Sequence, residues 1–228
     1  MATKKANVAE IKPMELSTVQ LTIVGDTPLI VHAWSEKAKR EMLDKQQGKA
    51  KKSKHEIKIP MNDFMNAAYW LTPKPENGAT DEEAVANWWA AVDAGAKFGF
   101  PVAGIKQSVI MGAKRGGLDV VMTELRGSFF LEGGTPDSTV DIAEIVGSVP
   151  EMREDMVRVG GQNKTADIRH RPEFKEWRIP LLMTYNLNGK YSLEQLLNCF
   201  NVGGFVCGIG EWRPERDGQF GMYRLEVD

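Results

Sequence analysis

The chain has 228 residues and a formal net charge of −2, and 42% of its residues are hydrophobic and 26% charged. This composition excludes a chain that is disordered throughout, and no run approaches the roughly 20 apolar residues that span a bilayer. Because the chain is not a polycation, an affinity for nucleic acid must come from local patches. Cys199 and Cys207 are too few for a disulfide framework, and residues 1–13 lack an apolar signal region. We therefore expect a cytoplasmic protein with no membrane partner.

The first part of the chain is predicted to hold a tail, one strand and three helices. Alternating β-branched residues indicate the strand, which is interrupted by a Gly-Asp-Thr-Pro turn. Hydrophobic residues at positions i, i+3, i+4 and i+7 indicate the second helix. Acidic residues at the start of the third predicted helix favour that helix. The predicted elements are a flexible tail (1–16), a strand (17–33), and helices over 35–44, 61–71 and 81–94.

The second part is predicted to alternate between strands and helices. Ser192 and Gln195 form a capping-box pattern before one helix, which Gly203 and Gly204 are expected to end. A stretch that carries charges of both signs is expected to project as a loop or hairpin. The predicted elements are a helix (101–115), a strand or hairpin (118–132), a strand (140–146), the projecting segment (150–176), a strand (177–185), a helix (192–202) and a strand (220–227).

The order of these elements predicts the fold class. If residues 34–100 and 134–174 are insertions, the remaining order is β-α-β-β-α-β, the ferredoxin-like or RRM-like order. We therefore expect an α+β protein with a single elaborated domain over 17–228, whose insertions are a helical region with a basic loop and a hairpin. Two helices would cover one face of the sheet, and RNA-recognition domains bind nucleic acid on the other face.

Basic residues are concentrated between Glu36 and Lys58. This segment holds nine basic and four acidic residues, whereas the rest of the chain holds 20 basic and 27 acidic residues. Such a segment predicts contact with a polyanion, and the alternative is a solvated helix followed by a lysine loop. The candidate phosphate-binding residues are Lys37, Lys39, Arg40, Lys45, Lys49, Lys51, Lys52 and Lys54.

A glycine-rich segment precedes the last predicted strand. Its pattern is G-x-G-x₇-G-x-x-G, formed by Gly208, Gly210, Gly218 and Gly221. Glycines let a backbone approach a ligand closely, while Arg213 and Arg216 could pair with phosphates and Trp212 could stack on a base. The alternative is that the glycines serve a tight turn or close packing within the protein.

This segment resembles the glycine-rich loop of the RAMP superfamily, whose members bind and process CRISPR RNA. In that family the loop lies between the second helix and the final strand of a ferredoxin-like domain, and residues 23–29 are similar to the family's first strand and turn. The insertions resemble the extra elements of its backbone subunits, which grip a guide strand and assemble side by side. The chain also resembles uncharacterised bacteriophage proteins at Thr27–His32 and Gly210–Pro214. These resemblances imply a homo-oligomer or filament in a phage-infected host cell, with a host-defence protein as a possible further partner.

A second basic and aromatic cluster is Arg169, Arg171 and Trp177. It could bind a single strand by charge and stacking, and the alternative is cross-strand pairing within a hairpin. His32 and His170 are isolated in the sequence, and each could be a general acid or base or a structural residue. The sequence shows no metal-ligand spacing and no cofactor motif, so we expect neither a metal nor a cofactor.

Taken together, the sequence predicts a non-catalytic protein that binds single-stranded RNA or DNA and assembles side by side along the strand. One alternative is a phage anti-defence or assembly protein that acts through protein contacts and mimics or caps a CRISPR backbone subunit. Another is an RNA endonuclease that uses one of the two histidines.

Overall fold

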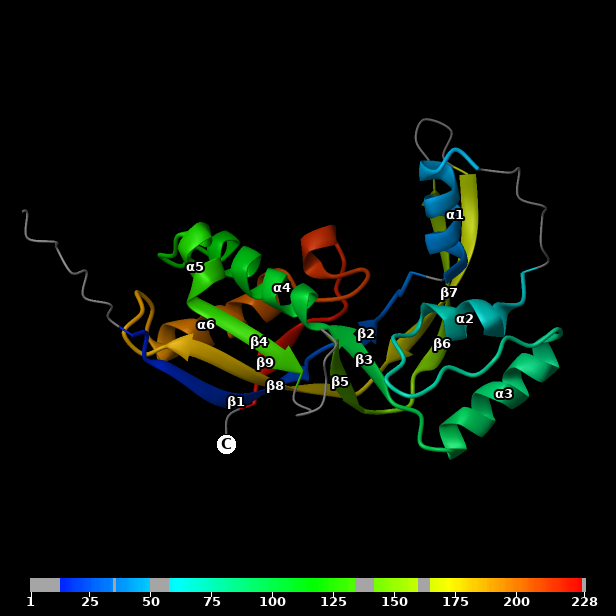
Figure 1. The fold of residues 1–228 in the computed structure, drawn as a ribbon, viewed down its shortest axis with the longest axis horizontal. Helices are drawn as coiled ribbons and strands as arrows, with labels where there is room; N and C mark the ends of the chain where they lie inside the picture. Colours follow the sequence, from blue (N-terminus) through cyan, green and yellow to red (C-terminus); the bar gives the residue numbers. More distant parts are fainter. Residues whose placement is uncertain (1–12, 35, 50–57, 134–141, 160–164, 227–228) are drawn as a thin grey trace, which may run out of the picture.

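The computed structural model describes residues 13–34, 36–49, 58–133, 142–159 and 165–226. The protein is a mixed α+β structure with antiparallel sheets, arranged in two lobes (Figure 1). We call them the sheet lobe, which holds a six-stranded sheet and α4 to α6, and the hairpin lobe, which holds a three-stranded sheet and α1 to α3.

The sheet lobe is built around the long strands β1 and β8, which pair antiparallel from Leu16 opposite Asn186 to Val24 opposite Arg178. Strand β9 pairs with the end of β1, and β4 pairs with the other edge of β8, so four strands lie in the order β4-β8-β1-β9. Strands β3 and β5 extend the sheet from β8. The strands are β1 (Leu16–Gly25), β3 (Phe98–Pro101), β4 (Phe129–Gly133), β5 (Ile142–Gly147), β8 (Trp177–Asn186) and β9 (Tyr223–Leu225).

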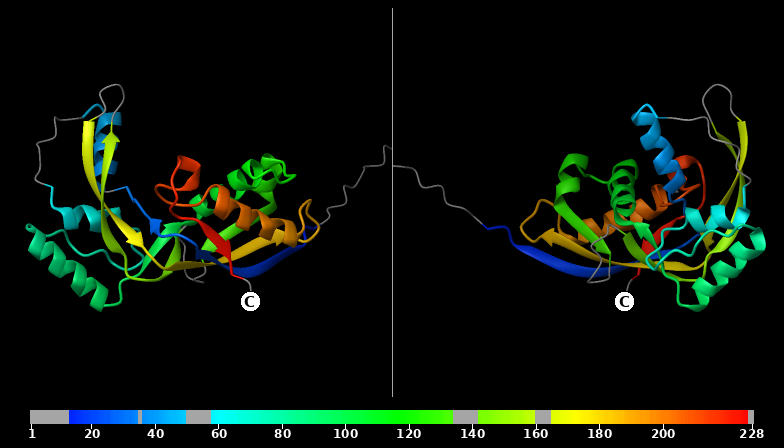
Figure 2. Two further views of the ribbon diagram at one scale, coloured as in Figure 1. Left: turned by 180° about the vertical axis from the view of Figure 1, so that it is seen from behind. Right: turned by 45° about the vertical axis from the view of Figure 1, so that its right-hand side comes forward.

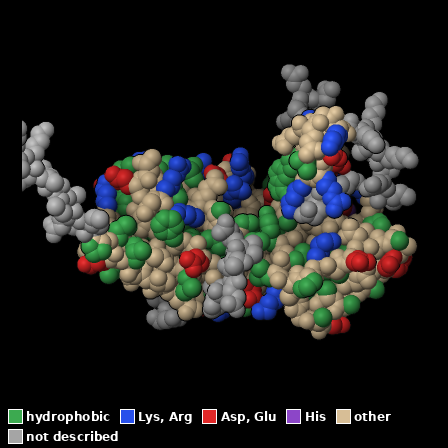
Figure 3. All heavy atoms as spheres, in the orientation of Figure 1, with side chains coloured by type: hydrophobic (Ala, Val, Ile, Leu, Met, Phe, Trp, Pro, Cys, Tyr) green, Lys and Arg blue, Asp and Glu red, His purple; other side chains and the backbone are tan. Residues whose placement is uncertain are grey.

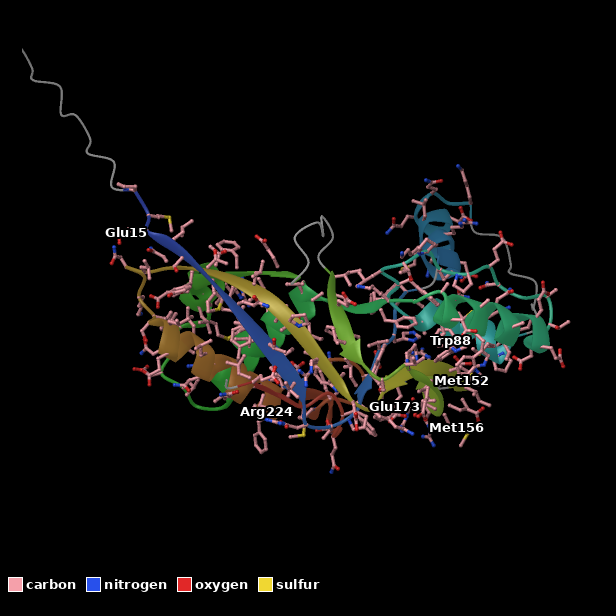
Figure 4. The ribbon with its side chains drawn as sticks, turned by 90° about the horizontal axis from the view of Figure 1, so that it is seen from below. Glu15, Trp88, Met152, Met156, Glu173 and Arg224 are labelled. Carbon is pink, nitrogen blue, oxygen red and sulfur yellow. The ribbon has the colours of Figure 1, made fainter. Side chains whose placement is uncertain are left out.

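Helices cover one face of this sheet. In the chain, α4 lies between β1 and β4, and α6 lies between β8 and β9. Figure 2 shows the helices on one side of the strands, and Figure 4 shows β1 and β8 uncovered on the other. The alternation in β8 explains this, because Ile179, Leu181 and Met183 are fully buried and their neighbours are not. The elements are α4 (Val102–Arg115), α5 (Met122–Ser128), α6 (Leu193–Val206) and the 3₁₀ turn η1 (Pro214–Arg216).

In the hairpin lobe, α2 packs against β7 and α3 packs against α2. An aromatic cluster forms its core, in which Trp88 lies 4.7 Å from Phe64 and 5.5 Å from Phe98 between ring centroids. Phe98 also lies 6.0 Å from Phe174, which joins β3 to the hairpin. The elements are β2 (Leu29–Ile30), α1 (Glu36–Gln46), α2 (Pro60–Ala67), α3 (Asp81–Asp93), β6 (Glu151–Val159) and β7 (Thr165–Phe174), with the strand order β2-β7-β6.

Several predicted elements are confirmed, the helix predicted over 61–71 ends early, at Ala67, and one predicted stretch is wrong. The projecting segment is an antiparallel hairpin of β6 and β7, and the capping box of Ser192 and Gln195 is present at α6. The stretch 118–132, predicted as a strand or hairpin, contains α5 before β4, because Met122 and Leu125 follow helical spacing and Leu125 is fully buried. The predicted tail lies mostly outside the described residues, although Leu16 already belongs to β1.

Gly203 and Gly204 do not end α6, contrary to the prediction. A Cβ atom built on Gly112 of α4 would lie 2.4 Å from the Cα of Gly203, and one on Gly204 would lie 1.8 Å from the carbonyl oxygen of Tyr223. The hydroxyl of Ser108 donates to the carbonyl of Gly203 over 3.2 Å. These glycines therefore let α4, α6 and β9 approach each other closely.

We expect Gly203→Ala to destabilise the protein by about 1–3 kcal/mol, the usual cost of overpacking. The new Cβ would lie 2.8 Å from the Cα of Val109, which is main chain and cannot move aside cheaply. The matched control is Gly127→Ala in α5, where no atom lies within 4 Å, so that only the helix-propensity gain of up to about 1 kcal/mol remains. Urea unfolding of both variants checks this, and equal midpoints would contradict it.

Candidate nucleic-acid interface

A cleft of about 440 Å³ lies where the two lobes meet. Four segments line it: His32 and Trp34 after β2, Tyr69 after α2, Phe100 of β3 with the first half of α4, and part of the glycine-rich loop, which we define as residues 208–221. Figure 3 shows hydrophobic side chains facing the hollow between the lobes, and Lys and Arg side chains beside it on the hairpin lobe. Surfaces of this kind suit ligands that combine flat rings with negative charge.

The glycines of the loop are used for close packing within the protein. Gly208, Gly210 and Gly221 have φ of 63°, 77° and 66°, and a Cβ on Gly210 would lie 2.4 Å from the carbonyl oxygen of Ile30. One on Gly218 would lie 1.7 Å from the carbonyl oxygen of Trp212. These contacts favour the packing interpretation of the pattern, and the packed loop forms one wall of the cleft.

Trp212 is exposed on this loop, whereas Arg213 is engaged within it. The guanidinium of Arg213 donates to Glu215 over 2.8 and 3.0 Å and to the carbonyl of Gly210 over 2.9 Å. The Trp212 side chain is 42% exposed, and its φ of 52° is one that a non-glycine residue rarely adopts. Arg216 is exposed at the end of η1. Trp212 and Arg216 can thus reach a ligand, and Arg213 first of all holds the loop.

The interpretation of Trp177 as a stacking residue has to be corrected. Its side chain is 3% exposed, and its indole N–H donates to the carbonyl of Thr27 over 2.8 Å. A base cannot stack on a ring that the core encloses. Trp177 therefore anchors β8 to the turn that follows β1.

Arg171 is also buried, with 2% of its surface exposed, so it cannot contact a phosphate directly. Its Nη1 lies 3.2 Å from Asp155 Oδ2, and its Nη2 lies 3.6 Å from Glu211 Oε2. Arg171 thus joins the hairpin to the glycine-rich loop. Arg169, two residues earlier, is partly exposed and lies 3.8 Å from Asp167, so it is the member of the predicted cluster that can reach a ligand.

The basic segment is described only in part. Lys37 lies in α1 without a described side chain, and Lys51, Lys52 and Lys54 fall outside the described residues. The other predicted residues, which are Lys39, Arg40, Lys45 and Lys49, are all exposed. Trp34 lines the cleft and α1 begins two residues later, so this helix starts beside the cleft. Figure 1 shows α1 on the hairpin lobe.

His32 is a titratable residue in the lining of the cleft. Burial lowers its pKa, and the positive charges of Arg171 and Arg169 lower the pKa further against the opposing effect of Glu211 and Asp63. The imidazole is therefore neutral at pH 7. Burial and the charge of Glu211 raise the pKa of the Tyr69 hydroxyl, which stays protonated. His170 lies apart from this group on β7, with its Nε2 3.3 Å from Glu154.

The open face of the sheet is a poorer site than the cleft. In the described strands β1 and β8 the residues on that face are Thr18, Gln20, Thr22 and Val24, and Arg178, Pro180, Leu182 and Thr184. None of these is aromatic, and in the described strands only the exposed Phe130 of β4, opposite Thr184, adds an aromatic side chain to this face. RNA-recognition sheets hold bases by stacking on two or three aromatic side chains. The cleft, in contrast, is lined by Trp34, Tyr69 and Phe100.

Sequence reasoning missed Trp34, Tyr69, Gln107 and Glu211 as site residues. Trp34 directly precedes a basic helix and Glu211 lies inside the glycine pattern, so the sequence around each gave a weak indication of a binding site. Tyr69 and Gln107 carried none, because their positions depend on how α2 and α4 pack.

No protein-family model matches the chain, and no curated protein matches it. In the described ranges no helix is long and apolar enough to cross a membrane. Among the same residues no group of three or more His, Cys, Asp or Glu side chains could hold a metal ion.

We expect Arg171→Met to destabilise the protein by about 3 kcal/mol, because it breaks a buried ion pair: the buried Asp155 would keep only Arg153, and Glu211 would lose its cation. The control is Lys175→Met, which removes an exposed ion pair with Glu151 and should cost at most about 1 kcal/mol. Thermal and urea unfolding measure both. If the two variants lost equal stability, the buried network would not join the lobes as described.

Proposed function

We propose that the protein binds single-stranded nucleic acid, RNA or DNA, across the cleft between its two lobes, without catalysing a reaction. The observation that carries this proposal is the cleft itself, which has the exposed Trp34 in its lining just before the basic helix α1. Trp34 is 60% exposed, and Trp212 is exposed on the glycine-rich loop, outside the lining of the cleft. Stacking platforms beside positive charge are the elements with which proteins hold single strands without reading sequence.

We further infer that the sheet lobe has a ferredoxin-like core. The strand order β4-β8-β1-β9, with α4 and α6 as connections and all neighbours antiparallel, supports this inference. The segments between β1 and α4 and between β4 and β8 would then be insertions, and they build most of the hairpin lobe. Together with the glycine-rich loop, this arrangement supports the resemblance to RAMP backbone subunits.

In the proposed binding mode, α1 contacts phosphates and the two tryptophans contact bases. The side chains described for α1 are all exposed and contribute little to the core. An exposed basic helix attracts a polyanion at little structural cost, since no buried contact has to be broken.

A second candidate function is a protein contact through the hairpin. Met156 of β6 is 80% exposed and stands opposite Ile168 of β7, which is also exposed. Exposed apolar pairs on a projecting hairpin favour contact with another copy of the chain or with a host-defence protein. Side-by-side copies would combine both functions.

Binding to single strands should weaken steeply with salt, and neutralising α1 should reduce that dependence. In Lys39→Gln/Arg40→Gln/Lys45→Gln, the slope of log K against log salt should fall by up to about 2, at roughly 0.7 per phosphate contact. The control Lys97→Gln/Lys175→Gln/Lys190→Gln removes the same charge from other surfaces. Fluorescence anisotropy with labelled single-stranded RNA, single-stranded DNA and duplex DNA measures the slopes. Absence of binding at low salt would reject the function in favour of the protein contact.

Removing either exposed tryptophan should weaken single-strand binding by about 1–3 kcal/mol, the value of one base stacked on an aromatic ring. The variants are Trp34→Ala and Trp212→Ala. The control is Trp89→Ala on α3, an exposed tryptophan that belongs neither to the cleft lining, as Trp34 does, nor to the glycine-rich loop, as Trp212 does. The same titration reports the losses, and an equal loss in all three variants would show that the effect is not stacking in the cleft.

A further inference from the structure

The cleft is suited to a base rather than to a phosphate. Its volume of about 440 Å³ lies toward the lower end of the range in which proteins hold small organic molecules, about 300–1,000 Å³. This space accommodates one nucleobase with its sugar and excludes several nucleotides in a row. The rings of Tyr69 and Phe100, 6.3 Å apart between centroids and inclined by 69°, provide apolar walls.

The charges that line the cleft are already paired. Arg213 is bound to Glu215, which also lies 3.2 Å from Arg115. Glu211 lies beside the buried Arg171. Among the described lining residues no Lys or Arg is left to neutralise a phosphate, whereas Arg169 and the basic side chains of α1 lie outside the lining. The phosphates therefore belong at the rim and the base inside.

Glu211 is the polar group best placed to select that base. Its side chain is 41% exposed and lines the cleft. The 3.6 Å distance to Arg171 is longer than a hydrogen bond, and in the described part of the chain no donor is recorded on its carboxylate. An ionised carboxylate only accepts hydrogen bonds, so it requires N–H groups on the ligand.

The position of Glu211 is fixed before a ligand arrives. Its backbone N–H donates to the carbonyl of Ile30 over 2.8 Å, and Gly210 presses against the same carbonyl. Arg171 behind it compensates its negative charge, which would otherwise repel a nucleotide. A carboxylate that is held in place and partly neutralised can read a base edge with little rearrangement.

We propose that the cleft binds one unstacked nucleobase and that Glu211 selects bases by the N–H groups on their Watson–Crick edge, guanine first. This inference rests on the proposed single-strand binding. Guanine offers the adjacent N1–H and N2–H₂ donors to the two carboxylate oxygens. Cytosine and adenine offer one amino group each. Uracil and thymine offer one N–H between two carbonyls, whose oxygens the carboxylate repels.

The test compares labelled oligouridines that differ only at the central base: uridine, guanosine, inosine, adenosine or cytidine. Anisotropy titrations give the dissociation constants. Guanosine should bind about tenfold more tightly than uridine, as expected for a bidentate contact. Inosine, which lacks only the N2 amino group, should lose most of that gain. The same series in oligothymidine tests DNA.

The variant Glu211→Gln should bring the guanosine-to-uridine ratio close to one, because an amide keeps only one acceptor oxygen and so cannot accept from both N–H groups of guanine. Glu132→Gln, an exposed carboxylate of β4 outside the cleft, should keep the wild-type ratio. If the wild-type protein binds all central bases equally, the inference fails and the proposed function stands. If it binds no oligonucleotide, both fail. A guanosine preference that survives Glu211→Gln would also overturn the role of Glu211.

Discussion

Arg171 joins the two lobes from a position that water does not reach. Its guanidinium lies between Asp155 of the hairpin and Glu211 of the glycine-rich loop, and its Nε has no hydrogen-bond partner among the described residues. A buried cation is costly unless carboxylates surround it, so the hairpin and the loop are held at a distance set by this one side chain. Arg153, stacked over Phe220 at 4.7 Å and paired with Asp155, holds the same junction from the solvent side.

The chemistry of the cleft follows from this arrangement. The charged groups that hold the lobes together are paired with each other. The cleft therefore presents aromatic rings, the neutral imidazole of His32 and the accessible carboxylate of Glu211. In the proposed binding mode, the positive charge that would attract a strand over a distance is carried by α1 and Arg169, outside the lining. Attraction and recognition would then belong to different residues, as is usual where proteins bind nucleic acid.

Local patterns predicted much of the fold and little of the site. Alternation in β8, the capping box at Ser192 and the charged hairpin depend on neighbours in the sequence, so periodicity and capping rules found them. The burial of Trp177 depends on Thr27, 150 residues earlier, and the burial of Arg171 depends on Glu211. Trp177 and Arg171 are residue types that are common in nucleic-acid-binding sites, but in this protein they stabilise the fold. The cleft itself combines four separate segments that no local rule connects.

The contact between Gly112 of α4 and Gly203 of α6 fixes the positions of two walls of the cleft. Helix α4 carries Gly104 and Gln107 into the lining, and α6 leads directly into the glycine-rich loop. Because the two helices touch through backbone atoms, neither can slide or rotate without displacing the other. Two walls of the cleft are therefore positioned by one helix crossing that contacts no ligand. A change in the packing of α4 against α6 would therefore change the width of the cleft. The shape of this surface site depends on packing inside the protein.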